Sequence, residues 1–258
     1  MAGPRCFVEG VLRAGETLTL SAEERHHLTR VLRVREGGAV TLLNGAGAVA
    51  QGVLVADGRG ASVSVEAVQT RPPPAVALHW LQALPKGRLM DTLVRQAVEL
   101  GVRRIVPVTS DHCDVRLEAD SKRPQAKRER WRQAAIEAMK QSGTAWLPAI
   151  EPVQPLKTFL ASRRASTAGE ALLVASLEAG AERLAGVLAQ LPRTTTAVTV
   201  AVGPEGDFSR EEYAALRLQG GLPVRLGESV LRVETAAVYA LSVADQWRCS
   251  HADASIGE

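Results

Sequence analysis

Residues 199–209 read TVAVGPEGDFS, and this stretch decides how the chain folds. The apolar, β-branched run at 197–202 predicts a buried strand. Ser209 and Glu212, three residues apart, have the pattern of a capping box, which predicts a helix directly after the loop. Open α/β folds bind ligands in such strand-to-helix turns, at the carboxyl edge of the sheet. The loop at 203–208 is therefore the first candidate for a binding site.

A second loop, LGESVLRVETA at 226–236, has the same context. A short strand is expected before it, at 224–226, and a long apolar helix after it, up to about Arg248. One Gly-rich corner is weak evidence because ordinary turns share the pattern, but two corners this close predict one shared pocket. The first loop is acidic and lacks the Gly-Lys-Ser/Thr ending of a phosphate-binding loop, so a neutral or cationic ligand is favoured.

The composition predicts a globular protein with one large or two ordinary domains. The chain has 258 residues, of which 46% are hydrophobic, and a formal net charge of +3. Three widely spaced cysteines, Cys6, Cys113 and Cys249, argue against a disulfide framework and fit a reducing cytoplasm. Neither an apolar run long enough to cross a membrane nor a signal peptide is recognisable. We therefore expect a cytoplasmic protein that does not bind membranes.

The first part of the chain predicts a small barrel. Strands are expected at 7–12, 17–20, 39–43, 49–55 and 62–68, with one helix that Ser21 and Glu24 begin. The run GAGAVA at 45–50 resembles a dinucleotide-binding fingerprint, but strand-like residues follow it, so a hairpin turn is expected instead. Prolines at 72–74 mark the domain boundary because they are stiff and lack the amide hydrogen that a sheet needs.

The second part predicts a parallel sheet with helices on both faces, because strands and helices alternate along it. Strands are expected at 76–84, 105–108, 172–176 and 197–202. Between the first two lies a helix that Gly101 ends. The tail at 251–258 is expected to be disordered.

Basic residues cluster in a helix expected at 121–142. They are Lys122, Arg123, Lys127, Arg128, Arg130 and Arg132. The cluster is equally typical of a solvated helix face and of a surface that contacts RNA phosphates, whereas Trp131 is expected in the core. His26 and His27 are neighbours, so they point in different directions on a helix and no metal site is predicted.

Taken together, the two loops resemble a known family. GPEGDFS at 203–209 with Leu226-Gly227 and LRVETA at 231–236 is similar to the bacterial 16S rRNA uracil-N3-methyltransferase family (RsmE). Further matches follow in the same order along nearly the whole chain: Arg5 and Phe7, His26-His27-Leu28, Val31-Leu32-Arg33, Lys86, Glu99-Leu100-Gly101-Val102, Arg130-Trp131, Glu137-Ala138 and Gln141-Ser142.

The resemblance implies an α/β fold with two domains. A PUA-like, RNA-binding β-barrel is implied at 1–72, and at 73–250 a SPOUT methyltransferase domain whose parallel sheet contains a deep trefoil knot. It also implies S-adenosylmethionine as cofactor, no metal, a homodimer, and the 16S rRNA of the small ribosomal subunit as partner. The residues implied to surround the cofactor are Leu177, Glu178, Val202, Gly203, Pro204, Glu205, Gly206, Leu226, Gly227, Val230 and Leu231.

The implied reaction is methylation of uridine N3, whose loss of a proton spreads negative charge over O2 and O4. Arg232 is expected to stabilise that charge, unless it only pairs with Glu234 to hold the loop. Glu234 is the candidate general base, with capping of the last helix as its alternative role. The residues expected to bind RNA are Arg5, His26, His27, Arg30, Arg33, Lys86, Lys127 and Arg128.

Two alternatives and several departures accompany this interpretation. Ribose 2′-O-methylation by another SPOUT branch is disfavoured because the motifs of that branch are missing, and a non-catalytic ribosome-assembly factor is disfavoured because both loops are intact. The family often has glycine where Asp207 stands, arginine near Thr144, and a Ser/Thr-x-Arg-Ser pattern where Ser110-Asp111-His112-Cys113 stands.

Overall fold

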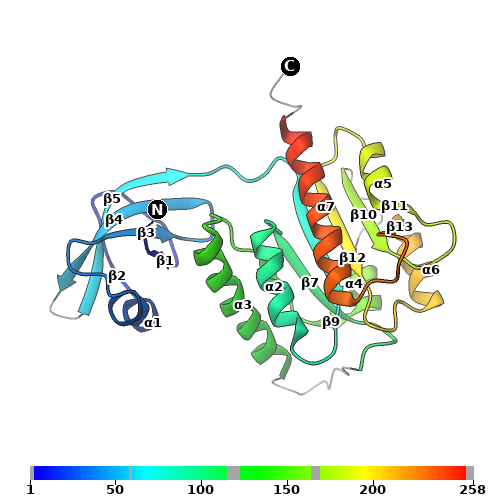
Figure 1. The fold of residues 1–258 in the computed structure, drawn as a ribbon, viewed down its shortest axis with the longest axis horizontal. Helices are drawn as coiled ribbons and strands as arrows, with labels where there is room; N and C mark the ends of the chain where they lie inside the picture. The colour runs from blue at the N-terminus through cyan, green and yellow to red at the C-terminus, as the bar shows by residue number, and fades with distance from the viewer. Residues whose placement is uncertain (1–2, 58–59, 115–122, 164–168, 254–258) are drawn as a thin grey trace. The chain divides into compact units, whose positions relative to one another are not determined.

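The computed structural model describes residues 3–57, 60–114, 123–163 and 169–253, which form two compact units (Figure 1). The first unit comprises Met1–Pro73 and Ile136–Leu147. The second comprises Pro74–Ala135 and Pro148–Glu258. The first unit thus includes a segment from the middle of the chain. A single boundary at residue 72 does not account for this segment.

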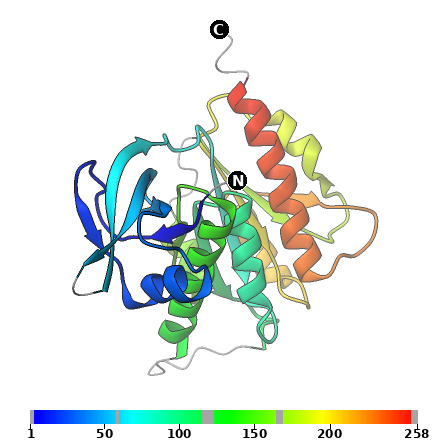
Figure 2. The ribbon, with the colours of Figure 1, turned by 60° about the vertical axis from the view of Figure 1, so that its left-hand side comes forward.

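A curled five-stranded sheet forms most of the first unit (Figure 2). Its strands follow the order β1-β3-β4-β5-β2, with β1 parallel to β3 and the other pairs antiparallel. The strands are β1 (Arg5–Phe7), β2 (Thr17–Thr19), β3 (Ala39–Leu43), β4 (Ala48–Asp57) and β5 (Gly60–Thr70). The expected strand at 7–12 is wrong beyond Phe7, because Gly10 adopts a φ of 104° that interrupts extended pairing. The expected hairpin at 45–50 is confirmed, since β3 and β4 pair antiparallel on either side of it.

A short helical segment packs against this sheet. Ser21 caps α1 (Ala22–His26) by accepting a hydrogen bond from the Glu24 amide at 3.2 Å, and α1 continues into the π-helical turn η1 (His27–Val31). Leu28 is fully buried and belongs to the core of the unit, together with Val40, Leu42 and Val63. The barrel core therefore lies between this segment and the concave side of the sheet.

Hydrogen bonds and an ion pair attach the segment Ile136–Leu147 to the first unit. The Arg5 guanidinium donates to the carbonyls of Lys140 at 2.9 Å and Gln141 at 2.7 Å. The Lys140 ammonium lies 2.8 Å from Glu24 Oε1, and both side chains are more than nine-tenths buried. Trp146 forms an isolated bridge with Ala46 in the β3–β4 hairpin. These contacts explain why the segment packs with a region more than sixty residues earlier in the chain.

An eight-stranded parallel sheet forms the centre of the second unit. Its order is β11-β13-β10-β12-β6-β7-β8, and β9 also pairs with β7. The strands are β6 (Ala77–Ala83), β7 (Arg104–Thr109), β8 (Ala149–Ile150), β9 (Gln154–Pro155), β10 (Glu170–Ala175), β11 (Glu182–Arg183), β12 (Ala197–Val202) and β13 (Gly221–Arg225). The parallel sheet expected from the alternating pattern is therefore confirmed.

Helices cover both faces of this sheet (Figure 1). On one face lie α2 (Leu89–Glu99), α5 (Leu184–Gln190) and α7 (Val233–Asp253). On the other, α4 (Leu156–Ser162) and α6 (Arg210–Leu218) share a core with Leu81, Val106 and Val174 of the strands. Strand residues are consequently buried on both sides, as their near-continuous apolar sequence requires.

Two helix limits refine the sequence predictions. The basic helix α3 spans Arg123–Ser142, so Lys122 lies outside the described residues, and Trp131 is buried as expected. The last helix, α7, continues to Asp253, so the tail expected at 251–258 is wrong for its first three residues. The rings of Trp247 and His251, with centroids 4.7 Å apart, stack across the last turn and support it. Within the described chain, no helix is both long and apolar enough to cross a membrane.

Candidate active site

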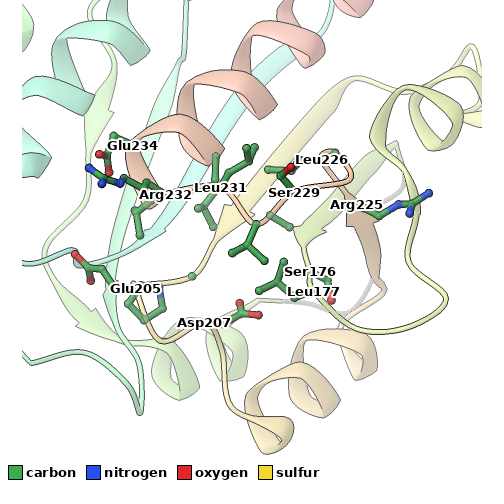
Figure 3. Close-up of a pocket in the computed structure, with 18 residues that line it drawn as sticks. Ser176, Leu177, Glu205, Asp207, Arg225, Leu226, Ser229, Leu231, Arg232 and Glu234 are labelled. Atoms are coloured by element: carbon green, nitrogen blue, oxygen red, sulfur yellow. The ribbon is translucent and has the colours of Figure 1, made fainter.

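Three loops meet at the carboxyl edge of the second sheet (Figure 3). They follow β10, β12 and β13, which are neighbours in the order β13-β10-β12, so their carboxyl ends lie side by side. Between the loops is a cavity of about 450 Å³. The shared pocket predicted from the two Gly-rich corners thus has a counterpart in the structure, with a third wall from the segment after β10.

Most residues predicted to hold a cofactor line this cavity, as do both predicted catalytic residues. Those at the wall are Leu177, Val202, Gly203, Pro204, Glu205, Leu226, Gly227, Val230, Leu231, Arg232 and Glu234. Two predicted residues are directed elsewhere. The Glu178 carboxylate pairs with Arg217 of α6, and Gly206 lies against the ring of His112.

Several lining residues were not singled out from the sequence. They are Ala175, Ser176, Arg225, Ser229, Val233 and Ala236, whereas Asp207, which was noted as a departure from the family, also lines the cavity. Ser176 and Arg225 stand at the carboxyl ends of β10 and β13, where the rule for open α/β sheets already places ligands. That rule, applied to every strand rather than to the Gly-rich loops alone, would have found both.

The loop at 203–207 is held by a buried hydrogen-bond chain at its first residue. The Gln82 amide donates to the Gly203 carbonyl at 3.2 Å, and Trp80 Nε1 donates to Gln82 Oε1 at 3.2 Å. Gln82 is fully buried, so its polar groups have to be satisfied inside the protein. A Cβ atom on Gly203 would lie only 3.0 Å from Asp207 Oδ1 and 3.2 Å from the Phe208 nitrogen. Glycine at 203 therefore allows the loop to close tightly on itself.

Asp207 has a left-handed backbone that glycine adopts more easily, with a φ of 61°. Its carboxylate accepts hydrogen bonds from the Phe208 amide at 2.8 Å and from the Tyr213 hydroxyl at 2.8 and 2.9 Å. Burial raises the pKa of Tyr213, so the hydroxyl keeps its proton and remains a donor. These bonds offset the conformational cost of a side chain at this position.

Charged groups of both signs surround the cavity (Figure 3). Glu205 accepts a hydrogen bond from the Lys86 amide at 2.9 Å. The Lys86 ammonium lies 3.1 Å from Asp114, and this hydrogen bond raises the pKa of Lys86. Among the described residues, no ion pair joins Arg232 to Glu234. The guanidinium of Arg232 is therefore not neutralised by the neighbour that the sequence suggested.

Arg232 and Glu234 stand at the start of the last helix. The Arg232 carbonyl accepts a hydrogen bond from the Ala236 amide at 2.8 Å, so Arg232 forms the amino-terminal boundary of α7. Glu234 lies in the first turn, where a carboxylate interacts favourably with the helix dipole. The backbone of both residues is thus fixed by a helix, while their side chains lie at the cavity wall.

The predicted RNA-binding residues are divided between the two units. Arg5, His26, His27, Arg30 and Arg33 belong to the first, and Lys86, Lys127 and Arg128 to the second. Arg30, Arg33 and His26 are exposed, whereas the guanidinium groups of Arg5 and Arg128 also bind backbone carbonyls. No group of His, Cys, Asp and Glu side chains suited to a metal ion occurs among the residues described.

The sequence matches two family models and is similar to a named bacterial protein. A model described as RNA methyltransferase domain matches residues 72–245, and one described as RNA methyltransferase PUA domain matches residues 20–66. The ribosomal RNA small subunit methyltransferase E of Bacillus subtilis is 27% identical over 231 residues, which make up 88% of this chain and 88% of that protein.

Two solved structures resemble the fold over nearly its whole length. One is the ribosomal RNA small subunit methyltransferase E from Neisseria gonorrhoeae bound to S-adenosyl methionine, with a TM-score of 0.83, 26% identity, and coverage of 95% of this chain and 98% of that one. The other is a putative methyltransferase from Legionella pneumophila in complex with the same cofactor, with a TM-score of 0.82, 28% identity and the same coverage of 95% and 98%.

Proposed function

This chain belongs to the RNA methyltransferase family, and from that premise we propose that it transfers a methyl group from S-adenosylmethionine to N3 of a uridine in the 16S rRNA of the small ribosomal subunit. The two family matches confirm the expected order of a PUA-like barrel followed by a methyltransferase domain. The observation that carries the proposal is the three-loop cavity with Arg232 and Glu234 at its wall.

The cavity suits the proposed cofactor in size and chemistry. Its volume of about 450 Å³ lies in the range of small-molecule sites. Leu177, Leu226 and Leu231 supply apolar walls, and a Cβ on Gly227 would meet no heavy atom within 4 Å, so the backbone there faces open space. The carboxylate of Glu205 at the wall favours a ligand that carries positive charge. When bound, the cofactor supplies an activated methyl group on a sulfonium.

The protein's contribution to the reaction is alignment and charge stabilisation. A reacting nitrogen has to be held in line with the methyl group at near-attack distance, which a site on rigid strand ends provides. We propose that Arg232 donates hydrogen bonds to the uracil oxygen on which negative charge develops as N3 loses its proton. We propose Glu234, two residues away on the first turn of α7, as the acceptor of that proton.

The RNA has to present its target base outside a stack, because the proposed site of the methyl donor is a cavity at the sheet edge. The exposed arginines at 30 and 33 and the basic part of α3 are proposed to contact the RNA backbone. Such contacts add salt-dependent affinity without selecting the base. We therefore assign the selection of uridine to the cavity, and the binding of the RNA backbone to the basic residues.

Three further features accompany the proposal: a trefoil knot around the three loops, a homodimer and a cytoplasmic site of action. The side chains of Leu177 and Val230 are 62% and 75% exposed although both line the cavity, and a second copy would cover such apolar groups. The cytoplasm is where small ribosomal subunits are available as substrate.

Single-turnover methyl transfer to small ribosomal subunits that lack the modification tests the assigned roles. Arg232→Ala is expected to lower the rate at least about a hundredfold, which corresponds to about 2.7 kcal/mol of transition-state stabilisation. The affinity for S-adenosylmethionine, measured by calorimetry, is expected to stay within about twofold, because the charge on uracil develops only in the transition state.

Arg210 provides the matched control, because it is exposed on α6 and does not line the cavity. Arg210→Ala is expected to react at the wild-type rate. A rate for Arg232→Ala within about threefold of this control would contradict the role of Arg232. Binding of RNA without any transfer by the wild-type protein would favour the non-catalytic alternative.

A further inference from the structure

The segment after β7 lies against the cavity loop that follows β12. His112 Nδ1 is 2.8 Å from the Gly206 carbonyl oxygen and 2.9 Å from the Asp207 carbonyl oxygen. Carbonyl oxygens only accept hydrogen bonds, so Nδ1 carries the hydrogen and shares it between the two. The reaction proposed above gives His112 no part, yet its ring binds the loop that forms one wall of the cavity.

Gly206 shows how closely this ring fits the loop. A Cβ atom built on Gly206 would lie 3.0 Å from Cβ, 3.4 Å from Cγ and 3.6 Å from Nδ1 of His112. The first of these distances is shorter than almost all real contacts of a Cβ atom. The imidazole thus packs directly against Gly206, where a side chain would clash with it. This explains the glycine at 206, although that residue does not line the cavity.

Neighbouring residues hold the two segments together at a second point. Asp111 Oδ2 accepts a hydrogen bond from the Ser209 hydroxyl at 2.6 Å. The Glu212 carboxylate accepts from the amides of Asp111 and Ser209, both at 2.9 Å. The backbone around His112 is therefore anchored independently of the ring. Removal of the ring should release the carbonyls at 206 and 207 without detaching the whole segment.

We infer that His112 is a positioning residue for the methyl transfer: its ring fastens the carbonyls of Gly206 and Asp207 and so holds the 203–207 wall in the shape that receives the cofactor. The identity of that cofactor rests on the proposed function. Without the ring, the loop has to be ordered when the ligand binds, and this cost lowers affinity. The chemical step itself does not involve the imidazole.

A histidine makes this contact sensitive to pH. Hydrogen bonds to the backbone of Asp207, and then of Gly206, raise the pKa of His112, and the carboxylates of Glu212 and Asp111 act in the same direction. The other charged groups of the two segments, Asp114 and Glu205, both contact Lys86, which follows β6: Asp114 pairs with its ammonium and Glu205 accepts from its amide. An imidazolium donates a stronger hydrogen bond than a neutral ring. The contact is thus strongest below a pH of about 6.5 and weakens as the pH rises through the higher pKa of the folded state.

Calorimetric titration of S-adenosylmethionine at pH 6.0 and 8.5 tests this inference. His112→Ala is expected to bind about five- to tenfold more weakly than the wild type at pH 6.0, as the loss of one charge-assisted hydrogen bond at an exposed site predicts. The wild type is expected to lose about threefold in affinity between the two pH values, and His112→Ala to lose none. Glu211→Ala, on the exposed side of α6, is the matched surface control and should follow the wild type.

His112→Arg separates positioning from a general effect on folding. Arginine keeps donors and a permanent charge, so it should recover most of the affinity and show the same value at both pH values. Gly206→Ala displaces the ring without changing it and should weaken binding to a similar degree as His112→Ala. In the double variant, the two losses should not add, because both remove the same contact.

The outcomes distinguish this inference from the proposed function. If the wild type binds S-adenosylmethionine and His112→Ala binds it equally well at both pH values, the positioning role is overturned and the proposed function stands. Full additivity of Gly206→Ala and His112→Ala would also overturn it. If the wild type itself fails to bind S-adenosylmethionine, the proposed function falls, and this inference with it.

Discussion

Replacement of Tyr213 by phenylalanine tests the hydroxyl group that holds the cavity loop. The Tyr213 hydroxyl lies 2.8 and 2.9 Å from the two carboxylate oxygens of Asp207, and the ring packs edge-on against Phe208 with centroids 5.7 Å apart. Tyr213→Phe keeps the ring and its packing and removes only the donor. The hydroxyl also lies 3.3 Å from the Ala175 carbonyl oxygen, so the free energy of unfolding should change by the worth of the hydroxyl's hydrogen bonds, of which the contact with the Asp207 carboxylate is the shorter.

The size of the effect follows from the environment of the two groups. Hydrogen bonds to charged partners contribute about 1.5–3 kcal/mol. Tyr213 is only 4% exposed, but Asp207 is half-buried and water can replace part of the lost interaction. We expect a loss of about 1–2 kcal/mol, which lowers the midpoint of thermal unfolding by about 2–8 °C for a unit of this size. The affinity for S-adenosylmethionine should fall as well, because Asp207 lines the cavity.

Thermal unfolding and calorimetric titration measure the two effects, and Tyr239 provides the control. Tyr239 is 45% exposed on α7, so Tyr239→Phe should leave both quantities unchanged. Asp207→Gly relieves the left-handed backbone, but it also removes the acceptor of the Phe208 amide and leaves the buried Tyr213 hydroxyl without this partner, so it should be at least as destabilising as Tyr213→Phe. A Tyr213→Phe variant with the midpoint and the affinity of the wild type would show that this hydroxyl does not hold the loop.

Two further predictions concern the first unit. Lys140→Met should destabilise the protein by about 3–5 kcal/mol, because it leaves the buried carboxylate of Glu24 without its ammonium partner. The double variant Lys140→Met/Glu24→Leu should recover much of that loss of stability. Urea unfolding measures the stability of both variants. Gly52→Ala should cost about 1–3 kcal/mol in the same assay, because its Cβ would lie 2.3 Å from the Ser64 carbonyl oxygen, and an unchanged unfolding midpoint would contradict the close approach of β4 and β5.

Local patterns in the sequence predicted the elements around the site well. The strand expected at 197–202 coincides with β12, because a short apolar run bounded by a glycine has few alternatives. The capping box of Ser209 and Glu212 is present with both of its hydrogen bonds. Gly101 ends α2 with a φ of 70°, as a C-terminal glycine should. In each case the residues that predict an element lie within a few positions of that element.

Contacts between distant segments were beyond the reach of such patterns. Nothing in the helical periodicity of α3 indicates that its last turns pack with the barrel, because that depends on Lys140 meeting Glu24, 116 residues earlier. The contact of His112 with the carbonyls at 206 and 207 likewise joins segments more than ninety residues apart. The left-handed backbone of Asp207 could not be predicted from the aspartate itself. The glycine that the family often has at this position is the one indication of it.

Mapping of the transferred methyl group shows directly which atom of the RNA the protein methylates. Small ribosomal subunits that lack uridine N3-methylation would be incubated with the wild-type protein and labelled S-adenosylmethionine, and the product digested and analysed by mass spectrometry. Label is expected on N3 of a single uridine of the 16S rRNA. Label on a ribose 2′-oxygen would assign the protein to the other SPOUT branch, and a complete lack of label under conditions where S-adenosylmethionine and RNA both bind would contradict the proposed reaction.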